Sequence, residues 1–135
     1  MRWEPTAPEK SGRLIRTKVS FYYHYGIYVS PDEVIQFGLP TDPGKKSEDI
    51  RVLVSDVATF LNGGDIETGF PTAAELLKMR SPDHIVQIAR AQIGNGGYDI
   101  LHNNCEHFVN ACAFGVASSD FLDGVRAKIA KKLKK

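Results

Sequence analysis

The alternation of hydrophobic and polar positions along the first part of the chain predicts β-strands. Aromatic and β-branched side chains dominate residues 19–29, and a shorter apolar stretch covers residues 14–16. Turn-forming residues occupy positions 30–32, so residues 19–29 and residues 34–37 are predicted to pair as a hairpin. The pattern predicts a further strand at residues 51–54.

Helix-capping signals follow in the second part of the chain. Ser55 is suited to cap a short helix, and Thr72 with Glu75 forms a capping box that predicts a helix over residues 73–79. Another helix is expected to begin at Pro82, because proline is favoured in the first turn. Strands and helices in separate blocks predict an α+β domain.

The chain of 135 residues is long enough for one domain with its own core. Residues 1–10 contain two prolines and no period, and we expect an irregular N-terminal arm. The folded domain is predicted to span residues 11–119, with a loop at residues 65–71. Residues 120–135 show a helical apolar stripe among lysines, which predicts a basic amphipathic helix.

Charge is distributed unevenly along the chain. The net charge is +1, but residues 126–135 carry six basic side chains and no acidic one, so the remaining chain is acidic. Binding to nucleic acid is not expected, because it requires a basic face on the folded body. With no signal peptide or long apolar run, we expect a cytoplasmic protein. We expect its basic tail to contact an anionic membrane surface, and packing of the tail on the folded body is the alternative.

Cys105 is the first candidate for chemistry. Asn103 is suited to cap a helix and Glu106 completes a capping box, which makes Cys105 the second residue of that helix. Free N–H groups and the macrodipole lower thiol pKa values at such positions, so a thiolate near neutral pH is expected. Alternatively, Cys105 begins a buried stripe with Phe108 and Cys112. The two cysteines lie too far apart on one helix for a disulfide.

His24 is the candidate base for a thiol nucleophile. It lies within a predicted strand, where a polar ring needs a hydrogen-bond partner, and a core histidine without catalytic role is the alternative. Gln36 is the candidate to orient the ring. A three-residue loop at residues 30–32 places Gln36 diagonal to His24 on one face, whereas a four-residue loop turns it to the opposite face. Tyr22 and Tyr25, beside His24, are candidate substrate contacts.

Two motifs resemble a known family. Residues 24–29 (His-Tyr-Gly-Ile-Tyr-Val) and residues 104–109 (Asn-Cys-Glu-His-Phe-Val) are similar to the lecithin:retinol acyltransferase-like domain, a branch of the permuted papain-like superfamily that includes the NlpC/P60 proteins. The resemblance implies a circularly permuted papain-like core, with an antiparallel sheet packed on the helix that bears the cysteine. It also implies Cys105 as nucleophile and His24 as base. Gln36 stands where many members have a second histidine.

The resemblance implies a thiol-based acyltransferase or hydrolase that acts on acyl lipids of the phospholipid type through a thioester on Cys105. A cysteine peptidase or amidase of the NlpC/P60 type is the first alternative, and a weakly active or inactive binding module on the same fold is the second. No cofactor is expected, because no phosphate loop or dinucleotide fingerprint is present. No metal is expected either, because His102, Cys105 and His107 match no common zinc spacing.

Overall fold

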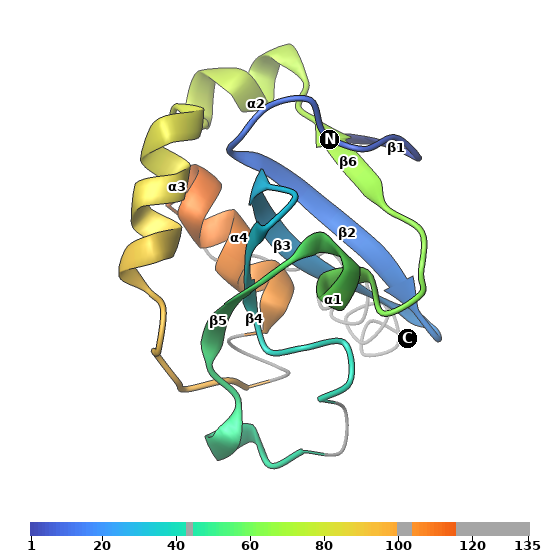
Figure 1. The fold of residues 1–135 in the computed structure, drawn as a ribbon. Coiled ribbons are helices and arrows are strands. Elements are labelled where there is room, and N and C mark those ends of the chain that lie inside the picture. Colours follow the sequence, from blue (N-terminus) through green and yellow to red (C-terminus); the bar gives the residue numbers. More distant parts are fainter. Residues whose placement is uncertain (43–44, 100–103, 116–135) are drawn as a thin grey trace, which may run out of the picture.

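The computed structural model describes residues 1–42, 45–99 and 104–115 (Figure 1). The elements follow one another as β1 (Arg2–Glu4), β2 (Arg13–Val19), β3 (Tyr22–Ser30), β4 (Glu33–Phe37), the 3-10 helix η1 (Ser47–Asp49), β5 (Val52–Ser55), α1 (Val57–Leu61), β6 (Glu67–Phe70), α2 (Ala73–Lys78), α3 (Pro82–Ala91) and α4 (Cys105–Phe114). The predicted tail at residues 120–135 lies outside the described residues, as do His102 and Asn103.

The strands form a six-stranded sheet in the order β1-β6-β2-β3-β4-β5. Every neighbouring pair is antiparallel. Helices α3 and α4 pack on one another, and α4 also contacts β3 and β4 at the centre of the sheet (Figure 1). The predicted α+β class, with an antiparallel sheet against the helix that carries Cys105, is therefore confirmed.

The two faces of the sheet bury different clusters because successive side chains of a strand point to opposite sides. The main core lies between the sheet and α3 and α4, and consists of Leu14, Tyr25, Ile27, Ile35, Phe37, Ile50, Val52, Ile85, Ala89, Cys105, Phe108, Val109, Cys112 and Ala113. On the α1 face, Ile15, Val34 and Phe60 form a smaller cluster. The α1 helix is thus held to the sheet mainly through Phe60, which is fully buried.

The predicted strand at residues 19–29 is in fact divided. A tight turn at Ser20 and Phe21 separates β2 from β3, and Ser20 adopts a positive φ of 59°. The two strands then pair from Val19 with Tyr22 onward. The sequence prediction was wrong here because Ser-Phe lacks the glycine or asparagine that usually marks a hairpin with left-handed residues.

The predicted irregular arm and the predicted loop at residues 65–71 are also corrected. Residues Arg2–Glu4 form β1, and they pair with β6 (Glu67–Phe70), which pairs in turn with β2. Gly69 leaves room for the Met1 and Trp3 side chains, because a Cβ there would overlap the Met1 sulfur and lie 3.1 Å from the ring of Trp3. These strands are too short for a recognisable alternation, so only tertiary pairing identifies them.

Helix capping agrees with the sequence in one place and differs by one residue in another. The Thr72–Glu75 capping box is present at the start of α2. The cap of α1 is Asp56, whose carboxylate accepts the Thr59 N–H, rather than Ser55. Ser55 is the last residue of β5, and its hydroxyl bonds to the Gln36 amide and to the Asp56 carbonyl instead.

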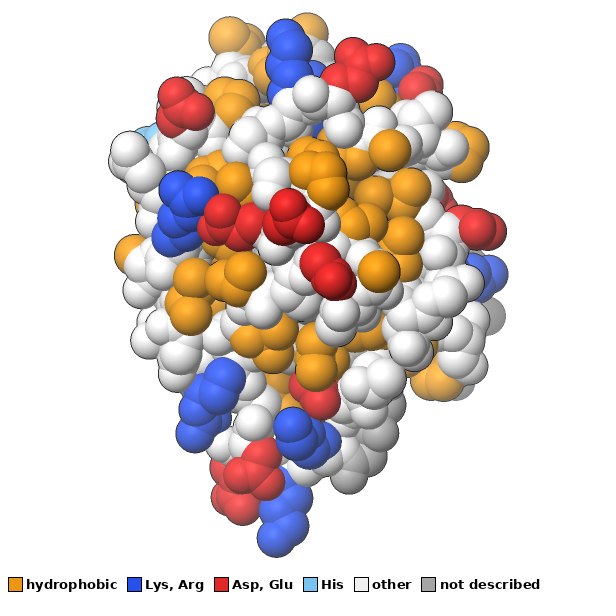
Figure 2. Space-filling view, viewed as in Figure 1, with side chains coloured by type: hydrophobic (Ala, Val, Ile, Leu, Met, Phe, Trp, Pro, Cys, Tyr) orange, Lys and Arg blue, Asp and Glu red, His pale blue; other side chains and the backbone are white. Residues whose placement is uncertain are grey.

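The surface mixes charge signs and hydrophobic groups. On the face shown in Figure 2, acidic and basic side chains are interspersed with hydrophobic ones. One ion pair joins α3 to β4 through Arg90 and Glu33 at 2.7 Å, and another joins Arg16 to Glu67 at 2.9 Å. Within the part of the chain that the structure describes, no helix combines the length and apolar character needed to cross a bilayer.

Candidate active site

The start of α4 is built by Asn104 and His107. The Asn104 side chain accepts the N–H groups of Glu106 and His107, each at 3.0 Å, and the His107 Nδ1 accepts the Asn104 N–H at 3.1 Å. The cap is therefore Asn104 instead of Asn103, and Cys105 is the first residue of the helix instead of the second. The reciprocal partner is the His107 imidazole, a role that the usual Glu or Gln pattern of a capping box does not predict.

The Cys105 thiol lies against the backbone of β3 beside His24. Its sulfur is 4.0 Å from the Tyr23 carbonyl oxygen, to which the S–H is directed, and the Tyr25 N–H donates to the sulfur. These two backbone groups flank His24 in the chain. The residue has 7% of its surface exposed, so the thiol is largely removed from water.

The protonation state of Cys105 differs from the expectation. Burial raises the thiol pKa to about 11, and the N–H groups of Tyr25, Glu106 and Cys105 itself lower it by less. The resting thiol is therefore neutral at pH 7, not a thiolate. A helix start alone does not activate a thiol when the sulfur is removed from water, because desolvation disfavours the charged form.

The alkylation rate of Cys105 should reveal this neutral thiol. In a Cys112→Ala background, we expect iodoacetamide to react slowly at pH 7 and about tenfold faster per pH unit in the alkaline range, since only the thiolate reacts. The measurement is the rate of carbamidomethylation of Cys105, followed by mass spectrometry as a function of pH. A rate already at its plateau near pH 7 would contradict the raised pKa.

Gln36 and His24 are joined directly. The His24 Nε2 lies 2.6 Å from the Gln36 Oε1, and both side chains are buried. Gln36 pairs with Gly26, the register predicted for a three-residue loop. The structure reaches that register with a two-residue turn and an irregularity between Tyr28 and Ser30. The predicted contact between the two side chains is therefore present.

The His24 ring is held on the α1 face of the sheet. The ring packs against Phe60 with 5.2 Å between centroids, and Gly26 allows this approach because a Cβ there would lie 2.8 Å from the Phe60 ring. Burial lowers the His24 pKa, and the Gln36 hydrogen bond and the Asp42 carboxylate oppose that shift in part. The imidazole is therefore neutral at pH 7 and able to accept a proton.

The three candidate residues lie close together, but only two of them are joined through their side chains. His24 and Gln36 share a hydrogen bond, and Cys105 contacts the backbone on either side of His24. Among the hydrogen bonds of the described residues, the thiol is directed to the Tyr23 carbonyl and not to the imidazole. The sulfur belongs to the main core, whereas the ring packs on the smaller cluster.

The two tyrosines predicted to contact substrate differ in environment. Tyr25 is buried in the main core, where its ring meets Trp3 edge to face at 5.7 Å and its hydroxyl bonds to Arg16. Its side chain is thus part of the packing. Tyr22 is half-buried. Burial, followed by the negative charge that Cys105 carries once it is ionised, raises the Tyr22 pKa and also the Tyr98 pKa. Tyr22 and Tyr98 are thus the tyrosines whose pKa the charge of Cys105 raises, and Tyr98 was absent from the predicted site.

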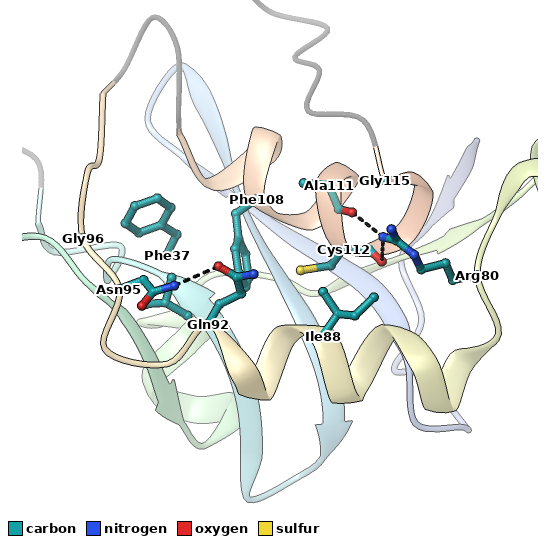
Figure 3. A pocket seen from close by; sticks show the side chains of 11 residues that line it. Phe37, Arg80, Ile88, Gln92, Asn95, Gly96, Phe108, Ala111, Cys112 and Gly115 are labelled. Atoms are coloured by element: carbon teal, nitrogen blue, oxygen red, sulfur yellow. Dashed lines mark hydrogen bonds between the residues drawn. The ribbon is translucent and has the colours of Figure 1, made fainter.

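Cys112 lies away from this site. It is buried in the middle of α4, and burial raises its pKa to about 12. Both cysteines are free, as predicted. Cys112 borders a cavity of about 320 Å³ between α3 and α4 (Figure 3), which is lined by Phe37, Val52, Arg80, Ile88, Gln92, Asn95, Gly96, Phe108, Ala111, Cys112 and Gly115. The Cys105, His24 and Gln36 side chains do not line it.

Comparison with known proteins decides the family. The family model "Lecithin retinol acyltransferase" matches residues 8–118, which include both candidate motifs. The chain belongs to the lecithin retinol acyltransferase family. The resemblance noted from residues 24–29 and 104–109 is therefore confirmed.

Individual relatives in this family are moderately similar. The chain is 29% identical to lecithin retinol acyltransferase of Rattus norvegicus over 126 residues, which covers 77% of this chain and 54% of the relative. It is 28% identical to phospholipase A and acyltransferase 3 of Homo sapiens over 125 residues, 86% of this chain and 77% of the relative. The chain spans about half the length of the lecithin retinol acyltransferases it matches.

Proposed function

We propose that the protein is a cysteine-dependent acyltransferase or hydrolase that acts on phospholipid-type acyl lipids through a thioester on Cys105. The observation that carries the proposal is the position of the Cys105 sulfur, at the start of α4 and against the backbone that flanks His24. Membership of a family whose relatives are named acyltransferases and a phospholipase supports the substrate class.

The reaction begins with transfer of the thiol proton. The Cys105 S–H turns from the Tyr23 carbonyl toward the imidazole, the proton passes to the His24 Nδ1, and the sulfur forms a bond to the ester carbonyl carbon. His24 then gives this proton to the departing alcohol as the carbon–oxygen bond breaks, which leaves a thioester. In the second half, His24 takes a proton from an alcohol, an amine or water as that acceptor attacks the thioester carbon. The carbon–sulfur bond then breaks, and His24 returns the proton to the sulfur.

Proton transfer and attack occur together in this scheme. The thiol holds its proton to a pKa of about 11, and the imidazole pKa lies below its ordinary 6.5, so a preformed thiolate–imidazolium pair is disfavoured. Formation of the carbon–sulfur bond removes negative charge from the sulfur while the proton leaves. The enzyme therefore acts by general-base catalysis on a neutral thiol.

Backbone N–H groups supply stabilisation for negative charge. Asn104 takes the N–H groups of Glu106 and His107 through its side chain, whereas the Cys105 N–H lies at the sulfur. We assign the Cys105 N–H to the oxyanion that forms on the carbonyl oxygen during attack. This N–H group does not have to reorient during the reaction, because the helix already fixes its position.

We also assign the core to the circularly permuted papain-like type. The strand that carries His24 precedes the helix that carries Cys105 in the chain, and an antiparallel sheet packs on that helix. The same core hosts cysteine peptidases and amidases, so a peptide or amide substrate is the competing hypothesis. The family match favours acyl lipids over that alternative.

The choice between lipid and peptide substrates is tested by the mass of the protein. After incubation with a diacyl phospholipid, we expect Cys105 to gain the mass of one acyl chain, and incubation with an ester-free peptide library should leave the mass unchanged. Peptide cleavage without any acyl adduct would favour the peptidase. The absence of both adduct and cleavage, with phospholipid presented in vesicles and in micelles, would favour an inactive binding module.

We further propose that the protein is cytoplasmic and contacts a membrane surface through the basic segment at residues 126–135. Six basic side chains in this segment attract anionic lipid headgroups. Deletion of residues 120–135 is expected to abolish co-sedimentation with phosphatidylserine vesicles at low salt, while the full chain binds. Equal binding by both proteins would exclude the tail as the contact.

A further inference from the structure

The polar contacts of His24 continue beyond Gln36 to the end of β5. The Gln36 Nε2 donates to the Ser55 Oγ at 2.6 Å, and the Ser55 hydroxyl donates to the Asp56 carbonyl at 2.9 Å. That carbonyl also accepts the Phe60 N–H at 3.1 Å, the first hydrogen bond of α1. His24 is thus connected through two side chains to the start of the helix whose Phe60 packs on its ring.

The donors and acceptors of these contacts all point in one direction. A serine hydroxyl has one proton, and the Asp56 carbonyl can only accept, so the Ser55 proton is committed to that carbonyl. Toward Gln36 the Ser55 oxygen is then an acceptor, and the amide group that faces it must be the NH₂. The opposite end of the amide, Oε1, therefore faces His24, where it can only accept.

We infer that Ser55 is a positioning residue that fixes the orientation of the Gln36 amide and thereby the tautomer of His24. With Oε1 as acceptor, the neutral ring carries its proton on Nε2 and keeps Nδ1 unprotonated. The inference rests on the proposed function, in which Nδ1 receives the thiol proton. A glutamine needs such a partner more than a carboxylate would, because its two ends have opposite hydrogen-bonding character and a flipped amide would reverse the tautomer.

The wild-type protein provides the first test. We expect the ¹⁵N chemical shifts of the His24 ring above pH 7 to show a protonated Nε2 and an unprotonated Nδ1 in a single tautomer. A proton on Nδ1 in the neutral ring would overturn the inference. This measurement needs no variant and no acyl donor.

The second test compares substitutions of Ser55. Ser55→Ala should allow the amide to flip, introduce the second tautomer and slow acylation of Cys105 about tenfold or more, as expected for a misplaced catalytic group. Ser55→Thr keeps the hydroxyl and should restore both properties. Ser30→Ala, which removes a hydroxyl that accepts the Asp32 N–H, is the matched control and should behave as wild type.

The outcomes separate this inference from the proposed function. Wild-type tautomer and acylation rate in a folded Ser55→Ala protein would overturn the positioning role and leave the enzyme intact. A tautomer that changes in Ser55→Ala, in a protein that never forms an adduct, would support the positioning role and reject the enzyme. If the alanine variant does not fold, the wild-type tautomer decides.

Discussion

Replacing Cys105 with alanine is expected to abolish the acyl adduct and to lower lipid turnover by a factor on the order of 10³ or more, because the variant lacks the atom that forms the thioester. Alanine fits the site, since Cys105 is a small buried side chain at the first position of α4. The helix should therefore form as in the wild type. The measurement is intact-mass analysis after incubation with phospholipid, together with the rate of fatty-acid release.

Cys112→Ala is the matched control for this experiment. The residue lies on the same helix, is also buried and has an even higher thiol pKa, of about 12, but it borders the cavity between α3 and α4, which Cys105 does not line. We expect this variant to form the adduct at the wild-type rate. An adduct that persists in Cys105→Ala and disappears in Cys112→Ala would transfer the nucleophile to Cys112 and overturn the proposed site.

The sequence predicted the parts of the site that depend on local spacing. The hydrogen bond between His24 and Gln36 follows from strand alternation and a twelve-residue separation, once the connecting turn is known. The turn itself was the open question, because one residue more or less moves Gln36 to the other face. In the structure, a short turn and an irregularity near Ser30 together place Gln36 on the face that a three-residue loop would give. No residue pattern specifies that combination in advance.

The protonation state of Cys105 could not be obtained from the sequence. The helix start and its capping residues are local features, and they correctly indicate N–H groups at the sulfur. Burial is a tertiary property, created here by β3 and by the main core, whose residues come from distant parts of the chain. Burial raises the thiol pKa by more than the N–H groups of the helix start lower it. The pKa shift therefore has the opposite direction to the one predicted.

Short strands and side-chain relays were missed for a related reason. Strand β1 has three residues, and its partner β6 lies more than sixty positions away, so neither shows a pattern without the other. Ser55 was assigned as a helix cap, a common role for serine before a helix. Its actual contact is Gln36, on a neighbouring strand, and only the pairing of β4 with β5 brings the two together.

Replacing His24 with alanine is expected to slow acylation of Cys105 about 10²-fold or more, because the thiol then has no positioned base to receive its proton. Because the Cys105 thiol is neutral, the acylation rate depends more strongly on the His24 base. A cysteine that is already a thiolate can attack without a base, whereas a thiol with a pKa of about 11 is roughly one part in ten thousand ionised at pH 7. The measurement is the single-turnover rate of adduct formation by intact mass.

The pH dependence distinguishes loss of a base from loss of packing. Burial lowers the His24 pKa, so the wild-type rate should fall only when the pH drops below the ordinary value of 6.5, and this acid limb should vanish in His24→Ala. The residual activity of the variant should instead rise toward alkaline pH, as hydroxide ionises the thiol directly. His84→Ala, which removes an exposed histidine from α3, is the matched control and should retain the wild-type profile. An unchanged acid limb in His24→Ala would remove His24 from the mechanism, because the titrating group would then be another residue.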